Sequence, residues 1–240
     1  LRVNTLKVDA EKAAFPLKSA NAEPSRLLHN AFHIPAKDPS EREASLESIP
    51  AYSKGWVEVQ DAGSQIAAAA ANAQPGEQVL DYCSGGGGKT LVHPSEPVQL
   101  DTLTGLMDCV FVDAPCTGTG TWRRRPDSKW RIKQGQLEKR MSEQTEILDA
   151  AAAFVKPGGR MVYATCSFLM EEDEDRVAEF LESHPEFTEE DAAAAAIASG
   201  LLTDEGANIV QRFRMPTGSV RLTPHRARTD GFFFAVLRRA

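Results

Sequence analysis

The sequence has few cysteines and no long apolar run. Cys83, Cys109, Cys116 and Cys166 are spread over 240 residues, with no CxxC pair and no His/Cys cluster at metal-ligand spacing. Neither a disulfide framework nor a metal site is therefore expected. A membrane span needs about 20 apolar residues in succession, which are missing here. Scattered thiols are typical of the reducing cytoplasm, where a cysteine matters mainly for its reactivity.

An excess of positive charge is missing as well. The formal net charge is −7, which disfavours nucleic-acid binding when it is taken as a whole. The cations are nevertheless clustered. One run contains Arg123, Arg124, Arg125, Lys129, Arg131, Lys133, Lys139 and Arg140, and a second contains Arg221, His225, Arg226 and Arg228. One cationic face can hold a phosphate backbone on an acidic protein, and a solvated helix surface is the alternative.

From residue 61 onward the pattern is that of an α/β protein. Strands are predicted over 78–83, 106–114, 160–165 and 232–237, and helices over 62–73, 136–155 and 171–183. The helix over 136–155 is expected to end at Lys156-Pro157-Gly158-Gly159. This alternation favours a mostly parallel sheet with helices on both faces.

The first part of the sequence differs from the rest. Residues 1–55 contain a candidate strand over 1–8 and a polar segment over 35–50 that is rich in Pro, Ser and Glu. We expect these residues to form a small N-terminal appendage, a truncated RNA-binding segment, next to a larger domain over 56–240. A further strand is predicted over 55–60.

A glycine-rich turn follows the strand over 78–83, in the run DYCSGGGGKT. Four glycines in succession let the backbone turn sharply and present N–H groups to a ligand. The run is not a Walker A loop, because that pattern would need a glycine at Cys83, and it is not a GxGxxG either. It indicates a loop for a nucleoside cofactor, with Lys89 placed to meet a carboxylate or phosphate. A plain surface turn is the alternative.

Two cysteines follow predicted strands. Cys116 stands in DAPCTGTG and Cys166 in TCS, at the strand ends where open α/β sheets bind ligands. An activated thiolate can add to carbon 6 of a pyrimidine, after which carbon 5 can accept a methyl group from a sulfonium. Asp113 is a candidate partner for the ring nitrogen. Position alone does not decide which cysteine attacks. Cys109, inside an apolar strand, is expected to be a small buried hydrophobe.

The order of these motifs carries a resemblance to a known family. DYCSGGGGKT, DAPCTGTGTWRRRPD, KPGGRMVYATCS and HRARTDGFFFAVL resemble the Sun/Fmu-type (RsmB-like) RNA cytosine-5 methyltransferases, as do QDAGSQ and LRVNTLK. DAPC followed by TCS is the specific part, because a DNA cytosine-5 enzyme takes its nucleophile from Pro-Cys. The resemblance covers nearly the whole chain. It implies a class I methyltransferase fold: a Rossmann-like α/β sheet, mostly parallel, with an antiparallel C-terminal strand.

The resemblance also implies residue roles. Cys166 would add to cytosine C6, Cys116 would assist release of the methylated product, and Asp113 would lie near the cofactor's methionine end and the target base. S-adenosylmethionine would bind at Cys83, Ser84, Gly85, Gly86, Gly87, Gly88, Lys89 and Asp113. RNA would bind at Arg123, Arg124, Arg125, Lys129, Arg131, His225 and Arg226. Trp122 and Trp130 are expected to pack in the interior rather than to stack on bases.

The sequence departs from the family in two places. Gly86 stands where the family usually has Pro. In addition, only LVHPSEPVQLDTLTG separates Thr90 from the DAPC strand, where the family has a helix and two strands that hold the ribose and adenine. Asp101 and Glu96 are poor substitutes for the acidic residues of those strands. Either residues are missing near 91–92, which the intact flanking motifs favour, or the chain has lost half of its cofactor pocket.

The predicted function is an S-adenosylmethionine-dependent RNA cytosine-5 methyltransferase that acts on ribosomal RNA in the cytoplasm, as a monomer and without a metal. A transfer-RNA enzyme, a DNA methyltransferase and a cofactor-deficient RNA-binding relative are the alternatives. The run WRRRPD favours the bacterial ribosomal branch, but the sequence does not say which RNA or which cytosine is modified.

Overall fold

The computed structural model describes residues 1–35, 49–83 and 100–240. The strands of the described residues are β1 Arg2–Val3, β2 Glu23–Pro24, β3 Phe32–His33, β4 Val57–Glu58, β5 Val79–Asp81, β6 Met107–Asp113, β7 Val155–Thr165, β8 Phe187–Glu190, β9 Val220–Leu222 and β10 Phe232–Arg239. Their helices are α1 Ala10–Leu17, α2 Pro50–Ser53, α3 Ala62–Ala69, α4 Gln134–Ala152, α5 Glu174–Ser183, α6 Ala192–Ala198, α7 Asp204–Arg212 and α8 Pro224–Ala227. Short 3₁₀ turns include Thr119–Thr121, Pro126–Trp130 and Met170–Glu172.

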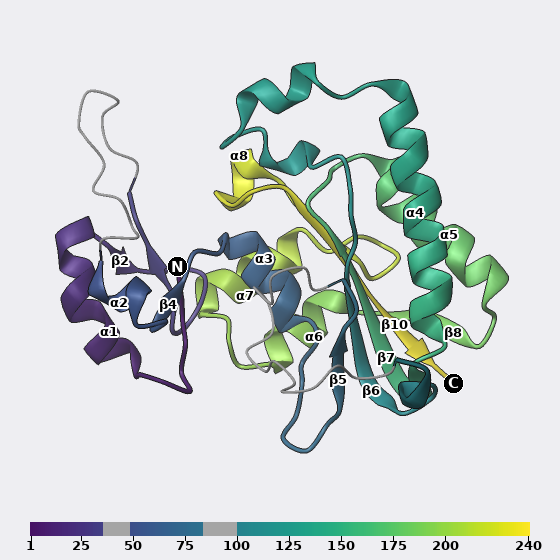
Figure 1. The fold of residues 1–240 in the computed structure, drawn as a ribbon, viewed down its shortest axis with the longest axis horizontal. Coiled ribbons are helices and arrows are strands. Elements are labelled where there is room, and N and C mark those ends of the chain that lie inside the picture. The colour runs from purple at the N-terminus through teal and green to yellow at the C-terminus, as the bar shows by residue number, and fades with distance from the viewer. Residues whose placement is uncertain (36–48, 84–99) are drawn as a thin grey trace.

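The main sheet has the order β5-β6-β7-β10-β8, and β9 also pairs with β10 (Figure 1). β5, β6 and β7 run parallel, whereas β10 is antiparallel to each strand that it contacts. β9 pairs with residues 232–234 and β8 with residues 236–239, so both lie on the same edge of β10. The prediction of a mostly parallel sheet with an antiparallel C-terminal strand is confirmed.

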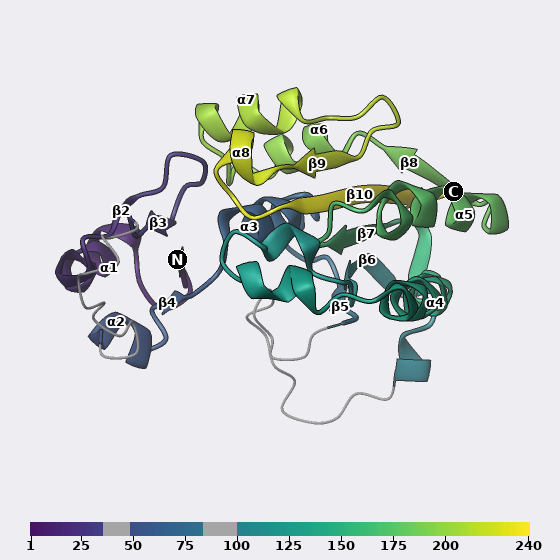
Figure 2. The same ribbon diagram turned by 90° about the horizontal axis from the view of Figure 1, so that it is seen from above.

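Both faces of this sheet are covered, as the alternation of side chains along β10 requires. Phe232, Phe234 and Val236 pack in one core with residues of α3, α6 and α7. Phe233, Ala235 and Leu237 pack in the other core with residues of α4 and α5. Figure 2 shows α6 and α7 on one side of β10 and α4 on the other. A continuous apolar run in the sequence thus becomes a strand that is buried on two sides.

Residues 1–35 and 49–58 lie to one side of the sheet (Figure 1) and have an apolar core of their own. Its largest members are Val3, Val8, Leu17, Phe32, Ile49 and Val57. β1 pairs with β4, and β2 pairs with β3. Backbone hydrogen bonds connect this region to the segment before α7, from Thr203 N to the Leu27 oxygen (3.1 Å) and from His29 N to the Leu201 oxygen (2.8 Å).

One predicted boundary is wrong. The long helix ends at Ala152 rather than at 155, and Lys156 to Gly159 lie inside β7 instead of ending the helix. Met107 of β6 pairs with Val155 and Cys109 pairs with Arg160, so β7 bulges between these pairs. Gly158 takes a φ of +73° in the bulge, a conformation in which glycine is not strained. The glycines therefore serve an irregular strand and not a helix terminus.

Some predicted elements are shorter in the structure, and some elements of the structure were not predicted. The candidate strands over 1–8 and 55–60 are reduced to two paired residues each, β1 and β4. The elements β8, α6, α7, β9 and α8 follow one another in a stretch for which the sequence pattern predicted none. No helix of the described residues is long and apolar enough to cross a bilayer.

Candidate active site

The site lies where β6 and β7 end side by side. The strands are parallel, and Asp113, the last residue of β6, is in register with Ala164 of β7. The loops that follow therefore leave the sheet at the same edge, which is where α/β sheets bind ligands. In Figure 1 the segment between β6 and α4 arches over this edge.

The two loops bring two thiols into contact. The Sγ atoms of Cys116 and Cys166 are 3.3 Å apart, and both side chains are partly buried. All four cysteines are among the described residues, and none of them is in a disulfide. The contact with Cys166 and burial raise the pKa of Cys116 well above its ordinary value. A second negative charge next to the first is unfavourable, so the pair holds one thiolate more readily than two.

The loop of Cys116 is held by a buried carboxylate. Glu172 is fully buried and accepts hydrogen bonds from the backbone N–H of Thr117 (2.7 Å) and from its hydroxyl (2.5 Å). The side-chain amide of Gln144 donates to Glu172 (3.2 Å) and to the carbonyl oxygen of Pro115 (2.9 Å). Residues on both sides of Cys116 are thus fixed to one network, which orients the thiol.

The loop of Cys166 is held in a similar way. Thr165 donates its hydroxyl proton to the buried carboxyl group of Asp173 (2.6 Å), and its oxygen accepts from the N–H of Ser167 (3.2 Å). The hydroxyls of Ser167 and Thr119 are 2.9 Å apart, which connects this loop to the loop of Cys116. These neutral groups stabilise the turn immediately before and after the thiol.

Asp173 is the most strongly shifted carboxyl of this network. Burial raises its pKa from an ordinary value near 3.8 to about 8, although the Thr165 hydroxyl and Arg221 favour the ionised form. The nearest Arg221 nitrogen is 3.6 Å from its second oxygen. A carboxyl with such a pKa carries its proton up to neutral pH.

The backbone itself crosses closely behind Cys166. Gly120 N donates to the Cys166 carbonyl oxygen (2.9 Å), and Gly231 N donates to the Gly120 oxygen (2.8 Å). A Cβ on Gly120 would lie 2.2 Å from the Gly231 oxygen, which is far inside van der Waals contact. Glycine is therefore required here, and three segments that are distant in sequence are joined at this crossing.

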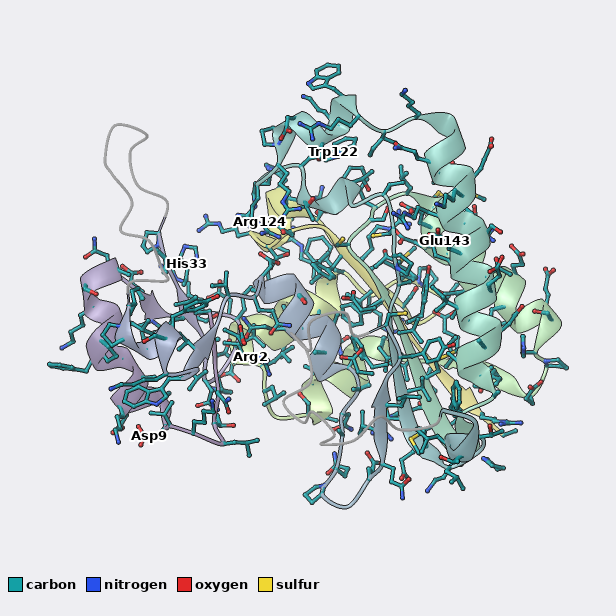
Figure 3. The ribbon with its side chains drawn as sticks, in the orientation of Figure 1. Arg2, Asp9, His33, Trp122, Arg124 and Glu143 are labelled. Atoms are coloured by element: carbon teal, nitrogen blue, oxygen red, sulfur yellow. The ribbon has the colours of Figure 1, made fainter. Side chains whose placement is uncertain are left out.

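The predicted RNA-binding cations fall into two groups. Arg123 and Arg124 bind Asp230, which is fully buried: Arg124 Nε donates to it at 2.6 Å, and an Arg123 nitrogen lies 3.3 Å away. Asp61 lies next to them, 3.6 Å from Arg123, and its pKa is raised by burial and by Asp230. Figure 3 shows Arg124 close to α8. This pair of arginines thus has a structural function, whatever else they bind.

The other five predicted cations are exposed, as are the side chains of Arg123 and Arg124 themselves. Arg125, Lys129, Arg131, His225 and Arg226 all have exposed side chains. Arg131 pairs with Asp127 across one turn (3.0 Å) in a segment that borders a cavity of about 310 Å³, whose lining also includes Cys116. Of these five predicted cations, Arg131 is the one that lines the same cavity as Cys116.

The two tryptophans of the same stretch behave differently. Trp122 packs edge-on against Phe168, with 5.4 Å between ring centroids, as predicted for a buried ring. Trp130 is 81% exposed, so the prediction that it packs in the interior is wrong. The 3₁₀ turn Pro126–Trp130 has no buried residue. It lies at the surface, and Trp130 is therefore outside the cores of the described residues.

Part of the predicted cofactor site is described. Cys83 follows β5 and packs, partly buried, at the edge of one core. Asp81 and Asp113 end two adjacent parallel strands. The predicted contacts Ser84, Gly85, Gly86, Gly87, Gly88 and Lys89, and the junction near 91–92, lie outside the described residues. Among the residues that the structure describes, no group of three or more His, Cys, Asp or Glu side chains could hold a metal ion.

Cys109 is fully buried in β6, as predicted, and burial raises its pKa to about 11. A thiol in this environment stays protonated and unreactive.

Four buried polar residues of the site were not predicted from the sequence: Glu172, Asp173, Gln144 and Asp230. Glu172 and Asp173 stand in the acidic run MEEDED, where their neighbours Glu171 and Asp175 are exposed. No difference in residue type marks the two buried acids. The only available signal was their position shortly after TCS, which requires some buried group to accept the N–H donors of the loop.

The chain is similar to known proteins. The family described as 16S rRNA methyltransferase RsmB/F matches residues 91–238. The ribosomal RNA small subunit methyltransferase B of Pectobacterium atrosepticum is 32% identical over 231 residues, which cover 80% of this chain and 49% of that protein. The protein of the same name from Yersinia pseudotuberculosis is 31% identical over 275 residues, covering 98% of this chain and 58% of its own length.

The chain therefore spans about half the length of the curated relatives it matches. The alignment of 275 residues is longer than the 240-residue chain, so that relative has segments without a counterpart here. Among solved structures, the chain resembles PH0851 with a TM-score of 0.76 and 27% identity, over 99% of this chain and 58% of that one.

Proposed function

The chain belongs to the RsmB/F family of 16S rRNA methyltransferases, and on that premise we propose that it methylates carbon 5 of a cytosine in ribosomal RNA. Cys166 is the nucleophile of this proposal, and Cys116 assists release of the product. The observation that supports it most directly is the 3.3 Å contact between the two thiols at the ends of neighbouring strands. A cysteine that only fills space in an apolar core would need no second thiol next to it.

The covalent step begins at Cys166. Its thiolate forms a bond to carbon 6 of the cytosine, and the electron pair of the C5–C6 double bond is displaced through carbon 5 and carbon 4 to the ring nitrogen N3. Protonation of N3 leaves an enamine whose carbon 5 is nucleophilic. Asp113 stands at the same sheet edge as a proton donor for the ring nitrogen. After carbon 5 has gained a methyl group, the ring nitrogen returns its proton to Asp113. Carbon 5 then loses its own proton to a base, the C5–C6 double bond re-forms, and the Cys166 thiolate leaves.

Cys116 fits the second half of this sequence. While Cys166 is a thiolate, its charge and hydrogen bond raise the pKa of Cys116, and Cys116 stays protonated. When the Cys166 sulfur is bound to carbon 6, that negative charge is gone. The main cause of the raised pKa of Cys116 then disappears, so this pKa falls and Cys116 can help to remove the proton from carbon 5. The two thiols thus act in turn: Cys166 is the thiolate before the covalent bond forms, and Cys116 can lose its proton afterwards.

The described residues fit S-adenosylmethionine as the methyl donor. The carboxyl groups of Asp81 and Asp113 lie at the ends of two adjacent strands, where their oxygens can accept hydrogen bonds from a ligand that carries an ammonium group. Cys83 and Asp113 would hold it, together with the glycine-rich run 84–89. When bound, the cofactor supplies an electrophilic methyl group. Asp113 would orient it next to the target base.

The RNA in this proposal is ribosomal. The curated relatives described above are named for the small-subunit ribosomal RNA, and transfer RNA is the competing substrate. Arg125, Lys129, Arg131, His225 and Arg226 supply exposed cations for its phosphates. A ribosomal substrate would place the reaction in the cytoplasm. The proposal needs one copy of the chain, since both thiols come from it.

The test uses RNA from cells that lack the gene, with labelled S-adenosylmethionine as methyl donor. The protein should transfer label to 16S rRNA, and digestion should locate it in 5-methylcytosine. Labelled transfer RNA without labelled 16S rRNA would favour the transfer-RNA alternative. If no RNA is labelled by a folded protein that still binds RNA, the cofactor-deficient alternative is correct.

The thiol roles are tested with two variants and a control. Cys166→Ala should form no covalent complex with RNA that contains 5-fluorocytosine, because no sulfur reaches carbon 6. Cys116→Ala should accumulate a covalent complex with ordinary RNA, seen as a shifted band on a denaturing gel. Cys109→Ala, which alters the buried thiol of β6, should behave like the parent in both assays: it should form the complex with 5-fluorocytosine RNA and accumulate none with ordinary RNA. The opposite pattern for Cys116 and Cys166 would indicate the mechanism of DNA cytosine-5 enzymes.

A further inference from the structure

The cavity beside Cys116 has a lining that suits an anion. It measures about 310 Å³, and Arg131, Lys139 and Arg140 contribute three cationic side chains to it. Lys139 and Arg140 come from the first half of α4, and Arg131 from the segment that precedes this helix. Because the lining also includes Cys116, the cavity lies directly next to the thiol pair.

The partners of these cations are carboxylates in contact with solvent. Asp127 pairs with Arg131 (3.0 Å), while Glu143 is shared by Lys139 (3.6 Å) and Arg140 (2.5 Å). Three cations thus face two carboxylates. Exposed ion pairs contribute at most about 1 kcal/mol each, so an incoming phosphate can compete for these cations. Figure 3 shows Glu143 on α4, away from Arg124, which binds the buried Asp230.

An aromatic ring stands in the same segment. Trp130 immediately precedes Arg131 and is the most exposed large apolar side chain among the described residues. The ammonium group of Lys129 lies 4.7 Å from the centre of its ring. A large apolar ring in water is unfavourable, because the burial of apolar surface lowers the free energy of the system. A flat, exposed ring flanked by cations is the arrangement that proteins use to stack nucleobases.

We propose that Trp130 and the basic cavity form a subsite for a nucleotide that neighbours the target cytosine in single-stranded RNA. The base stacks on Trp130, and a phosphate of the same strand lies in the cavity between Arg131, Lys139 and Arg140. The inference rests on the proposed function in one respect: the target base must lie at Cys166. An RNA strand with its base at this thiol then passes Cys116 and enters the cavity that Cys116 lines.

The test measures the binding of a fluorescein-labelled, single-stranded oligocytidine of eight nucleotides by anisotropy, at several salt concentrations. Trp130→Ala should weaken binding about tenfold without changing the salt dependence, because the base has no ring to stack on. Trp130→Phe should restore most of the affinity. The double variant Arg131→Ala/Lys139→Ala should weaken binding. It should also make the negative slope of log K against log salt shallower, by about 0.7 for each phosphate that is no longer neutralised.

The chain offers matched controls. Arg214 is an arginine at the surface that pairs with one aspartate, Asp191, as Arg131 pairs with Asp127. Arg212→Ala/Arg214→Ala therefore removes the same charge elsewhere and should keep the parental affinity and slope. Leu106→Ala removes an exposed apolar side chain at the opposite end of β6 and should also have no effect.

The subsite and the proposed function fail in distinguishable ways. If Trp130→Ala and Arg131→Ala/Lys139→Ala bind oligocytidine like the controls, the subsite is wrong, even when the parent protein methylates 16S rRNA. If these variants bind weakly and the controls do not, the subsite is supported even in a protein that transfers no methyl group. For an active protein, the variants should raise the KM for 16S rRNA several-fold and leave kcat nearly unchanged.

Discussion

Two regions meet at Cys116, and they hold their charges in opposite ways. On one side, the thiol site consists of Cys116, Cys166 and the fully buried carboxyls of Glu172 and Asp173, which accept hydrogen bonds from loop N–H and hydroxyl groups. On the other side, the basic cavity is lined by side chains that pair with carboxylates in contact with water. The first arrangement fixes geometry, whereas the second leaves cations available for a ligand.

The difference between the regions has an energetic consequence. A buried polar group without its partner costs about 1–3 kcal/mol, whereas most exposed ion pairs contribute less than about 1 kcal/mol. Changes in the thiol site should therefore alter folding as well as chemistry. Changes in the basic cavity should alter binding and leave stability almost untouched.

The largest effect is expected at the backbone crossing of the thiol site. Gly120→Ala places a methyl group 2.2 Å from the Gly231 oxygen, so the segments must separate. We expect a decrease of about 3 kcal/mol or more in the free energy of unfolding, measured by urea denaturation, together with loss of methyl transfer.

Gly135→Ala is the matched control for this change. Gly135 lies in the first turn of α4, where an added Cβ meets no atom within 4 Å. Alanine is the better helix former, so this variant should be slightly more stable, by up to about 1 kcal/mol. Equal stabilities of the two variants would show that the crossing does not restrict the thiol site.

A pH-dependent effect of intermediate size is expected at Asp173. Since its pKa is raised to about 8, the folded protein keeps a proton that the unfolded chain releases near pH 4. The free energy of unfolding should therefore fall as the pH rises from about 4 to about 8 and level off above that. Asp173→Asn mimics the protonated carboxyl, still accepts from Thr165, and should make the protein more stable than the parent at about pH 9.

Thermal unfolding of both proteins at about pH 5 and about pH 9 checks this expectation. The stability curve of Asp173→Asn should be flatter across this range than the parental curve. Asp175→Asn, at an exposed carboxyl two residues further on, should follow the parental curve. A parental pH dependence that persists in Asp173→Asn would show that another group causes it.

The smallest effect is expected in the basic cavity. Glu143→Gln removes the carboxylate shared by Lys139 and Arg140, so the change in the free energy of unfolding should stay within about 0.5 kcal/mol. Binding of the labelled oligocytidine should become about twofold tighter at low salt, because one repulsive charge is removed. A marked decrease in stability would mean that the two regions do not differ in the way that their burial suggests.

The strands that carry the site could be predicted from the sequence, but the groups that hold it could not. β6 and β7 were recognisable because their apolar runs end in DAPC and TCS. Which acid of MEEDED is buried depends on where the loop N–H groups point, and this is a property of the folded chain. Likewise, Trp130 is of a residue type that is common in cores, but it is exposed because no residue of its 3₁₀ turn is buried.

The same limit applies to the chain from residue 157 onward. Pro157-Gly158-Gly159 has the composition of a helix terminator, yet it accommodates a register shift against β6, which local composition does not encode. The elements β8, α6, α7, β9 and α8 each have nine residues or fewer, so no window is long enough for a helical or alternating pattern to stand out.

The position of β10 has a consequence for the synthesis of the protein. This strand follows every other strand of the sheet in sequence but lies between β7 on one edge and β8 and β9 on the other. Gly231, immediately before it, closes the crossing onto Gly120. A nascent chain on the ribosome can therefore form the parallel part β5-β6-β7 early, but the crossing behind Cys166 is complete only when residues 231–239 have emerged. The full set of backbone contacts behind the Cys166 thiol thus forms only after translation has passed this strand.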